Sequence, residues 1–343
     1  MHPHISDAIK APALVRLRDN LFVARFETMK VYSTLVAVER LLQSGKVRSG
    51  DTLLDSSSGI YAYALALACH RFGMHCHIVA SKTVDATRMA QLQILGATVQ
   101  QVPPQETLKH DQSLRVAIIG ELLAARDDIH WMQQYHDDIH YAGYAPVAEQ
   151  IAREIGAGAL SIVGGVGSGC STGGLAQCLR EIDDDVQLVG VQPFGSVTFG
   201  SEHLADPGII IAGIGSSIEF RNVRHALYDH LHWIGFDHGL SGAVALLREH
   251  AVFAGLSSGC VYLVAQREAQ RQPQRNWLLI AADTRHRYAE AVFARHVQAQ
   301  PLHTLAPREI ECLDELALPW STLHWRRRSF EQVRALGAAA LPA

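Results

Sequence analysis

The feature of this sequence that most constrains its fold is a regular alternation of short apolar stretches and longer helical patterns. The alternation predicts strands at 52–55, 75–80 and 98–102 and helices at 61–72 and 84–95. Both helical patterns stop at a glycine, Gly73 and Gly96, and a glycine there is a common helix end. Strands that alternate with helices favour an α/β protein with largely parallel sheets, in which ligands bind at the carboxyl ends of strands.

The same alternation precedes this block and returns in the second half of the chain. It predicts further strands at 21–26, 160–164, 187–191 and 276–282, and further helices at 31–43, 175–181 and 241–250. Two such blocks in 343 residues indicate two domains.

We expect the domains to be unequal and to be followed by an appendage. The prediction is a small, mobile domain at 41–135, a large domain formed by 1–40 and 136–300, and a C-terminal extension at 301–343. The extension contains four prolines and the basic run Arg326–Arg328, so we expect it to be only partly helical. A run of three arginines is usually a solvated surface or part of a subunit contact.

Composition excludes several classes of protein. Hydrophobic residues make up 48% and charged residues 19% of the chain, as in ordinary globular proteins. The net charge of -4 provides no footprint for nucleic acid. No apolar stretch approaches the ~18 residues of a membrane-spanning helix, and no secretory signal is visible. Six cysteines without a CxxC pair predict reduced thiols in a cytoplasmic protein.

Two groups of histidines are candidates for a metal site or a substrate site. His70, His75 and His77 lie near two cysteines, but their spacing matches no zinc pattern, so we expect no metal site. His136 and His140 are four residues apart without an HExxH context. We interpret them as a polar face, with a supporting role near a substrate as the alternative.

A loop rich in glycine and serine, Val-Gly-Ser-Gly-Cys-Ser-Thr-Gly-Gly at 166–174, follows a predicted strand and precedes a helix. Glycines let backbone N–H groups turn toward a ligand, and a helix N-terminus adds a partial positive charge, so the place suits a phosphate. The loop lacks GK[ST] and the spacing GxGxxG, so it is neither a Walker loop nor a dinucleotide fingerprint. The alternatives are a small-residue turn for the loop, and a reactive thiol or a packing residue for Cys170.

Three further positions carry side chains that could bind a ligand or take part in catalysis. Asp55-Ser-Ser-Ser-Gly59 also joins a strand to a helix, and could either hold a carboxylate or cap the helix. Lys30 precedes a predicted helix and is one of five lysines, the only side chains that supply an amine nucleophile. Asp283 follows the buried strand at 276–282, where a carboxylate either caps a helix or faces a ligand.

The order of these pieces along the chain resembles the fold type II pyridoxal-phosphate enzymes, the cysteine synthase family, over residues 12–296. The segments that carry the resemblance are Pro12–Arg16, Arg48–Gly59, Gly96–Thr98, Gly255–Gly259 and Asp283–Tyr288. Phe194-Gly-Ser-Val-Thr-Phe-Gly200, followed by Gly213-Ile-Gly215, is similar to the branch that makes precursors of 2,3-diaminopropionate. The resemblance implies a two-domain α/β fold of the tryptophan synthase β type and a homodimer.

The resemblance also implies a binding site for pyridoxal 5'-phosphate. Lys30 would be the Schiff-base lysine and would later move the substrate α-proton. The cofactor phosphate would be held by Gly167, Ser168, Gly169, Cys170 and Ser171. Asp283 would face the pyridine nitrogen.

For the substrate, the resemblance implies an activated L-serine, O-phosphoserine or O-acetylserine, which exchanges its leaving group for a nucleophile. The residues that would bind this amino acid are Ser57, Ser58, Gly59 and Gln134. The product would be a β-substituted alanine, used in siderophore or other secondary metabolism. Two alternatives stay open: α,β-elimination, and a non-catalytic homologue that acts as a binding partner.

The sequence departs from the family at two places near the expected site. About six residues are missing before Lys30, and Ile60 stands where the family has an asparagine that hydrogen-bonds the cofactor. These departures motivate the non-catalytic alternative, whereas the retained Lys30 and Asp283 favour an enzyme.

Overall fold

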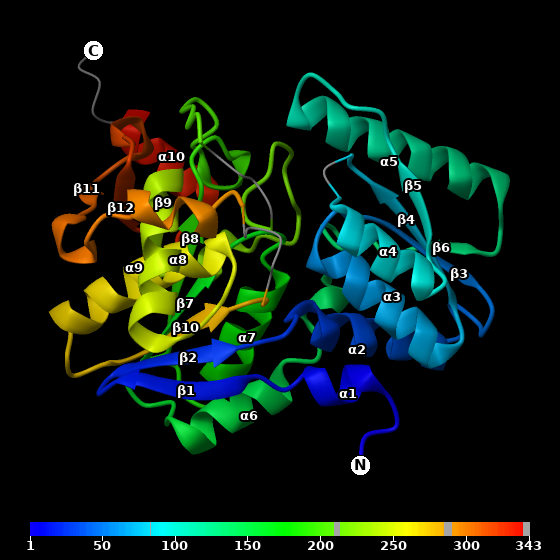
Figure 1. Cartoon of the computed structure of the whole chain (residues 1–343), viewed down its shortest axis with the longest axis horizontal. Helices are drawn as coiled ribbons and strands as arrows, with labels where there is room; N and C mark the ends of the chain where they lie inside the picture. The colour runs from blue at the N-terminus through cyan, green and yellow to red at the C-terminus, as the bar shows by residue number, and fades with distance from the viewer. Residues whose placement is uncertain (83, 209–212, 285–289, 339–343) are drawn as a thin grey trace. The chain divides into compact units, whose positions relative to one another are not determined.

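The computed structural model describes residues 1–82, 84–208, 213–284 and 290–338, and it divides the chain into two compact units. Unit 1 comprises 1–11, 28–144 and 220–222, and unit 2 comprises 12–27, 145–219 and 223–343. Both units contain a sheet with helices around it, as the alternating sequence pattern predicts (Figure 1).

Unit 1 is built on a four-stranded sheet in the order β5-β4-β3-β6, in which every pair of neighbours is parallel. Its strands are β3 (Thr52–Ser56), β4 (His75–Ala80), β5 (Thr98–Gln101) and β6 (Ile129–Trp131). Its helices are α1 (Ile5–Ile9), α2 (Lys30–Gln43), α3 (Ile60–Phe72), α4 (Ala86–Ile94), α5 (Leu108–Ala125) and the 3-10 turn η1 (Asp138–Tyr141). The first βαβαβ block is therefore confirmed almost to the residue.

The core of unit 1 forms where α2 and α3 pack together. Val31, Val38 and Leu41 of α2 are buried in one cluster with Leu65 and Ala68 of α3. This packing places α2 in unit 1, whereas the sequence-based boundary assigned residues 1–40 to the large domain. The boundary was drawn where the helix ends, but a helix belongs to the core that buries its apolar face.

Unit 2 is built on an eight-stranded sheet in the order β1-β2-β10-β7-β8-β9-β12-β11. Its strands are β1 (Ala13–Arg18), β2 (Leu21–Arg25), β7 (Leu160–Gly165), β8 (Gln187–Gln192), β9 (His230–Ile234), β10 (Asn276–Ala281), β11 (Arg308–Ile310) and β12 (Trp320–His324). Its α-helices are α6 (Ala145–Glu154), α7 (Cys170–Arg180), α8 (Phe236–His250), α9 (Leu256–Arg271) and α10 (Phe330–Ala338). Short 3-10 turns lie at Val197–Phe199, His225–Leu227, Phe293–Gln298, Leu302–Thr304 and Leu313–Glu315. The central strands β2, β10, β7, β8 and β9 pair in parallel, and β1 and β12 pair antiparallel to their neighbours β2 and β9.

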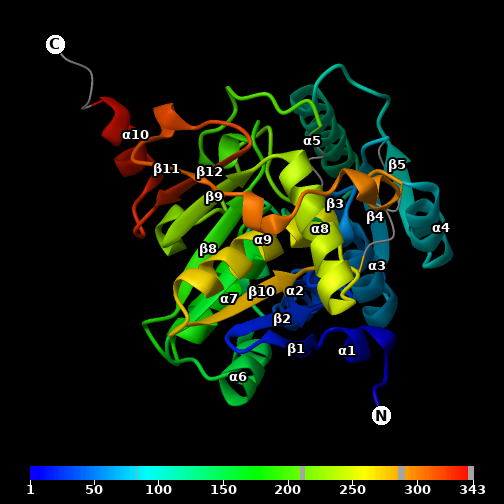
Figure 2. The same cartoon turned by 60° about the vertical axis from the view of Figure 1, so that its left-hand side comes forward.

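Helices α8 and α9 pack against each other beside the central strands of unit 2 (Figure 2). They approach so closely that a Cβ on Gly242 of α8 would overlap the carbonyl oxygen of Gly259 in α9. Tyr262 and Val264 of α9 are fully buried in the same core as Leu279 of β10. The two bare Cα atoms thus permit the close packing of this helix pair.

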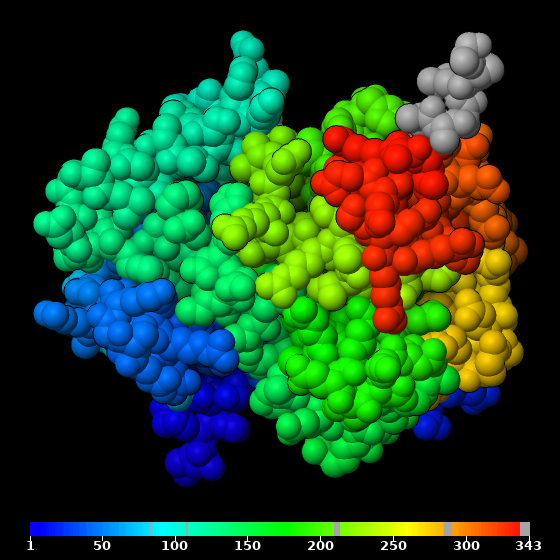
Figure 3. Space-filling model, turned by 180° about the vertical axis from the view of Figure 1, so that it is seen from behind, coloured from blue at the N-terminus to red at the C-terminus, as the bar shows by residue number. Residues whose placement is uncertain are grey.

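The C-terminal segment is part of the sheet of unit 2, although the sequence predicted an appendage. β12 pairs antiparallel with β9, and the side chains of Trp320 and Trp325 are almost completely buried. The ring of Phe330 stacks on His225 with 4.9 Å between centroids. Figure 3 shows the C-terminal residues, in red, lying against the surface of unit 2.

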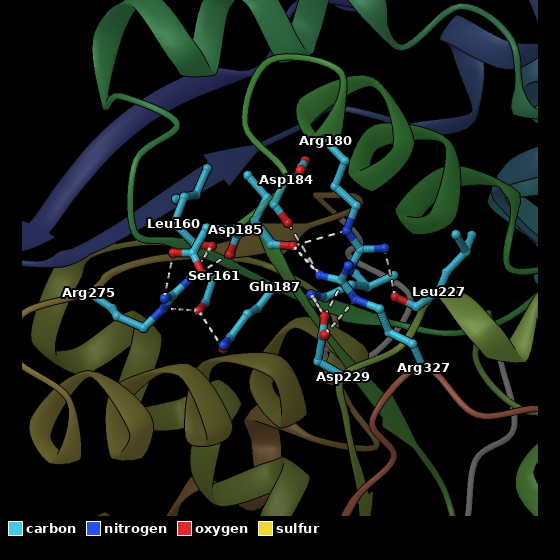
Figure 4. Close-up of polar contacts among 12 residues, drawn as sticks. Leu160, Ser161, Arg180, Asp184, Asp185, Gln187, Leu227, Asp229, Arg275 and Arg327 are labelled. Atoms are coloured by element: carbon cyan, nitrogen blue, oxygen red, sulfur yellow. Dashed lines mark hydrogen bonds and ion pairs between the residues drawn. The ribbon is translucent and has the colours of Figure 1, made fainter.

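An ion-pair network fixes this segment to the start of β8. The Asp229 carboxylate accepts hydrogen bonds from the Arg180 guanidinium at 2.8 Å, from Nε of Arg327 at 2.8 Å and from the backbone N–H of Leu188 at 2.7 Å (Figure 4). Arg275 and Asp185 form a neighbouring pair at 2.9 Å. Arg327 of the basic run therefore anchors the C-terminal segment.

Asp229→Asn should lower the free energy of unfolding of unit 2 by about 2–4 kcal/mol, because it leaves the largely buried Arg180 without a counter-ion. Urea unfolding followed by tryptophan fluorescence measures this change, since four of the five tryptophans lie in unit 2. The matched control is Glu154→Gln, which removes an exposed ion pair with Arg153 and should change little. Equal effects of the two substitutions would contradict the anchoring role.

The stability of unit 2 should fall as the pH decreases from about 6.5 toward 4. Burial holds the pKa of His232 well below 6.5 and lowers that of His230 to about 4. In His232, Nδ1 accepts a hydrogen bond from Trp320 Nε1 at 3.2 Å, so protonation there would break it. Below pH 6.5 these histidines are protonated in the unfolded chain but stay neutral in the folded one. Each group therefore lowers the free energy of unfolding by up to about 1.4 kcal/mol per pH unit.

Urea unfolding at pH 7 and pH 5 measures this dependence. His232→Gln should reduce the difference between the two pH values, whereas the exposed His303→Gln should not. An unchanged difference in the His232 variant would show that other groups govern the acid response.

Candidate functional site

Lys30 is the first residue of α2 and is partly buried. Its backbone is fixed by the helix that follows, because the hydroxyls of Ser33 and Thr34 donate to the Lys30 carbonyl at 3.2 and 2.7 Å. The preceding residues Thr28 and Met29 are almost completely buried. The chain thus holds this lysine firmly at the point where the helix begins.

The serine loop at 56–59 joins the carboxyl end of β3 to the first turn of α3. The hydroxyl oxygen of Ser57 accepts hydrogen bonds from the N–H groups of Gly59 and Ala62, both at 3.2 Å. The hydroxyl of Ser58 accepts one from the N–H of Ser81 at 2.8 Å. Ser57 therefore satisfies two N–H groups at the start of α3, whose N-cap residue is Gly59.

The buried carboxylate of Asp55 holds this loop in place through hydrogen bonds. Asp55, 1% exposed, accepts hydrogen bonds from the N–H of Ser56 at 2.7 Å, from Trp131 Nε1 at 3.1 Å and from the N–H of Gln134 at 3.0 Å. Burial raises the pKa of Asp55 to about 6. The Gln134 amide also donates to the Ser56 carbonyl at 2.7 Å. The structure therefore brings the predicted substrate residue Gln134 against the serine loop.

Arg115 of α5 also contacts this loop, and sequence reasoning missed it. The guanidinium donates to Ser56 Oγ at 2.7 Å and to the Asp111 carboxylate at 2.8 Å, and it is 7% exposed. No helix was predicted over 108–125. The acidic and basic residues four positions apart, Asp111 and Arg115, were the signal that could have revealed it.

The glycine-rich loop of unit 2 runs from β7 to α7. Gly169 precedes the helix with a φ of 81°, and no side chain caps the helix there. Val166 accepts a hydrogen bond from the N–H of Gly215 at 2.9 Å, and a Cβ on Gly167 would lie 2.5 Å from the Gly213 carbonyl oxygen. The loop therefore needs glycine at 167 and lies directly against the Gly-Ile-Gly motif.

The remaining predicted residues of this loop are placed as follows. Ser168 and Cys170 are buried, and Ser171 is partly buried in the first turn of α7. The Cys170 thiol contacts the Ser168 carbonyl at 3.8 Å and is completely buried, which favours a packing role over a reactive thiol. The first turn of a helix presents N–H groups that have no partner inside the helix, and these favour an anion.

Asp283 lies just beyond β10 and is 8% exposed. The strand beside it is fixed by a hydrogen bond from the N–H of Phe26 to the carbonyl of Ala281, at 2.9 Å. The Arg-His-Arg-Tyr part of the motif at Asp283–Tyr288 lies outside the described residues. The structure thus places Asp283 at the carboxyl end of a central strand, as predicted.

The loop at 194–201 and the segment at 213–218 form one hydrogen-bonded unit. The Ser196 hydroxyl accepts from the N–H groups of Thr198 and Ser216 at 3.2 and 2.9 Å. The two motifs that pointed to the diaminopropionate branch are therefore in contact within unit 2.

The described residues contain neither a metal-binding cluster nor a membrane-spanning helix. No group of three or more His, Cys, Asp or Glu side chains there is arranged to hold a metal ion. No helix in that part of the chain is both long and apolar enough to cross a membrane.

Ser57→Ala should lower the stability of unit 1 by about 1 kcal/mol, because two N–H groups at the start of α3 lose their acceptor. Thermal unfolding followed by circular dichroism measures the loss. The control is Ser49→Ala, whose exposed hydroxyl donates one long hydrogen bond to Gly73. A Ser57 variant as stable as the Ser49 variant would contradict the capping role.

Comparison with known proteins gives one family and several relatives. The family described as "pyridoxal-phosphate dependent enzyme" matches residues 7–283. A cysteine synthase of Helicobacter pylori is 29% identical over 252 residues, which are 72% of this chain and 79% of the relative. An N-(2-amino-2-carboxyethyl)-L-glutamate synthase of Ralstonia nicotianae is 29% identical over 264 residues, 75% of each chain.

Two solved structures share the fold. An O-acetylserine dependent cystathionine beta-synthase from Helicobacter pylori superposes with a TM-score of 0.74 at 24% identity, covering 84% of this chain and 97% of that one. A hydrogen sulfide-producing enzyme from Fusobacterium nucleatum gives 0.75 at 18% identity, covering 84% and 100%.

Proposed function

Because the chain belongs to the pyridoxal-phosphate dependent enzyme family, we propose that it catalyses β-replacement on an activated L-serine and releases a β-substituted alanine. The observation that carries this proposal is that one chain contains both a lysine at the start of α2 and an uncapped glycine loop at the start of α7. The family model spans residues 7–283, which include both.

The residues of the glycine loop fit a phosphate group. The helix α7 begins without a capping side chain, so its first N–H groups and its dipole can face an anion. Gly167 and Gly169 keep side chains away from the backbone at this point. We therefore assign the cofactor phosphate to Gly167, Ser168, Gly169, Cys170 and Ser171.

Pyridoxal phosphate supplies an aldehyde for imine formation and a ring that withdraws electrons from the substrate. Lys30 would hold the aldehyde and then accept the α-proton on Nζ. Asp283 would hold the ring nitrogen in its protonated form, because a carboxylate favours a nearby positive charge.

The serine loop would bind the substrate carboxylate. Ser57 uses its hydroxyl oxygen as an acceptor, so its hydroxyl hydrogen and the first turn of α3 can donate to an anion. We assign Ser58 and Gly59 of the same loop to this site as well. Gln134, held against the same loop, would orient the amino acid. The network around Asp55 keeps these groups in place before the substrate arrives.

The finer assignments follow sequence motifs and the name of one relative. We propose O-acetylserine or O-phosphoserine as the activated serine and a place in secondary metabolism, in line with the motifs at 194–200 and 213–215. The product in the name of the Ralstonia nicotianae synthase is a glutamate substituted on its nitrogen, which supports an amine nucleophile. We further propose a cytoplasmic homodimer.

One feature favours a second candidate reaction. Ile60, the first residue of α3, has no hydrogen-bonding side chain at the position where the family has asparagine. Weaker control of the cofactor there would favour α,β-elimination, with release of pyruvate and ammonia. A non-catalytic homologue is the remaining alternative.

The proposed function predicts that purified protein converts O-acetylserine or O-phosphoserine, with an amine or sulfide, into a β-substituted alanine. Lys30→Ala should lower this rate at least ~10³-fold, because it removes the amine proposed to hold the cofactor and to move the α-proton. The control is Lys46→Ala, which removes an exposed lysine.

Mass spectrometry of the product and an assay for pyruvate separate the outcomes. Pyruvate without a substituted alanine would replace β-replacement with elimination. No turnover with either serine and a panel of amines, thiols and sulfide would contradict the proposed function.

A further inference from the structure

His140 is a buried titratable side chain that the proposed function does not use. It lies in η1, is 2% exposed, and its Nε2 is 2.8 Å from the carbonyl oxygen of Met132. Because a carbonyl oxygen only accepts, Nε2 carries the proton and Nδ1 presents a lone pair. Burial lowers the pKa of His140 to about 4, so the ring is neutral near pH 7.

The Nδ1 atom of His140 has no hydrogen-bond partner among the described residues, although it is buried. Buried polar atoms in folded proteins almost always have a partner, and an exception indicates a ligand or a functional role. The missing partner must be a donor, because Nδ1 is an acceptor.

His140 lies beside the two helices of unit 1 that begin next to proposed site residues. Its ring meets the ring of Tyr61, in the first turn of α3, edge-on with 5.5 Å between centroids. η1 also packs against α2, and Gly143 approaches so closely that a Cβ there would lie 2.9 Å from the Tyr32 carbonyl oxygen. His140 is thus fixed between the start of α3 and the helix that begins with Lys30.

Electrostatics agree with this placement. After burial and the hydrogen bond to Met132, the charge of Lys30 is the next influence on the pKa of His140, and it lowers that pKa. Asp137 raises it and His130 lowers it. The amine of Lys30 therefore lies within electrostatic range of the imidazole.

We propose that His140 is a positioning residue for Lys30, whose amino group donates a hydrogen bond to Nδ1 while it carries the substrate α-proton. The inference rests on the proposed function: the α C–H bond breaks, an N–H bond forms on Nζ, and the electron pair stays with the substrate and its cofactor. A ring with a pKa of about 4 cannot take the proton from an ammonium near pH 7. His140 therefore orients the lysine without exchanging protons.

Two substitutions separate this role from a structural one. In His140→Gln the side-chain amide can still donate to the Met132 carbonyl, but the acceptor at the place of Nδ1 is lost. In His140→Asn the amide oxygen can replace Nδ1 as the acceptor, but the donor to Met132 is lost. A positioning role predicts damage from Gln and retention with Asn, and a structural role predicts the reverse.

The first measurement uses the full-length chain after removal of the cofactor with hydroxylamine. Competitive acetylation across a pH series gives the pKa of the Lys30 amine. An acceptor beside the ammonium raises that pKa, so His140→Gln should lower it by about half a unit to one unit. His140→Asn should leave it close to the wild-type value.

The second measurement uses the holoenzyme and L-alanine, which has no leaving group. The rate at which its α-deuterium exchanges isolates the proton transfer, and His140→Gln should slow it about tenfold. A Gln variant equal to wild type in both measurements, with Asn impaired, would overturn the positioning role. Absence of cofactor from Lys30 in the wild type would instead overturn the proposed function, and this inference with it.

Discussion

Parallel pairing of strands is the constraint on which the rest of the structure depends. In unit 1 it brings the carboxyl ends of β3 and β4 to one edge, where the serine loop leads into α3. In unit 2 it brings the ends of β7, β8 and β10 together, where the glycine loop leads into α7. Each unit therefore presents a helix N-terminus beside strand ends, which is where α/β proteins bind anions.

Buried polar contacts hold the loop at the end of β3 in place. Asp55 is held by three N–H donors, and Arg115 reaches the same loop from α5. These groups are costly to bury unless every partner is present, so they fix the loop in one conformation. In unit 2, Gly167 packs directly against the Gly213 carbonyl. This close contact restricts the conformation of the glycine loop.

Much of the fold could be predicted from the sequence, because the first βαβαβ block has clear apolar periods and glycine stops. The C-terminal strand β12 could not, since Trp320–His324 is short and lies among prolines and arginines that suggest a surface tail. Its strand character comes from pairing with β9, which is a non-local contact. The position of α2 in unit 1 was missed for the same reason.

Motif order proposed the site residues, but it did not reveal their neighbours. Ser57, Gln134 and the glycine loop lie where the motifs placed them relative to the strands of their own unit. The contact of Arg115 with Ser56 and the unpartnered Nδ1 of His140 both depend on which elements pack together. A local sequence pattern therefore cannot predict them.

The most direct test of the account is an absorption spectrum of the purified protein, followed by borohydride reduction and peptide mapping. The account predicts a visible band of a protein-bound Schiff base and a pyridoxyl group attached to Lys30. A protein that stays colourless with added pyridoxal phosphate, or a label on any of the other four lysines, would contradict it.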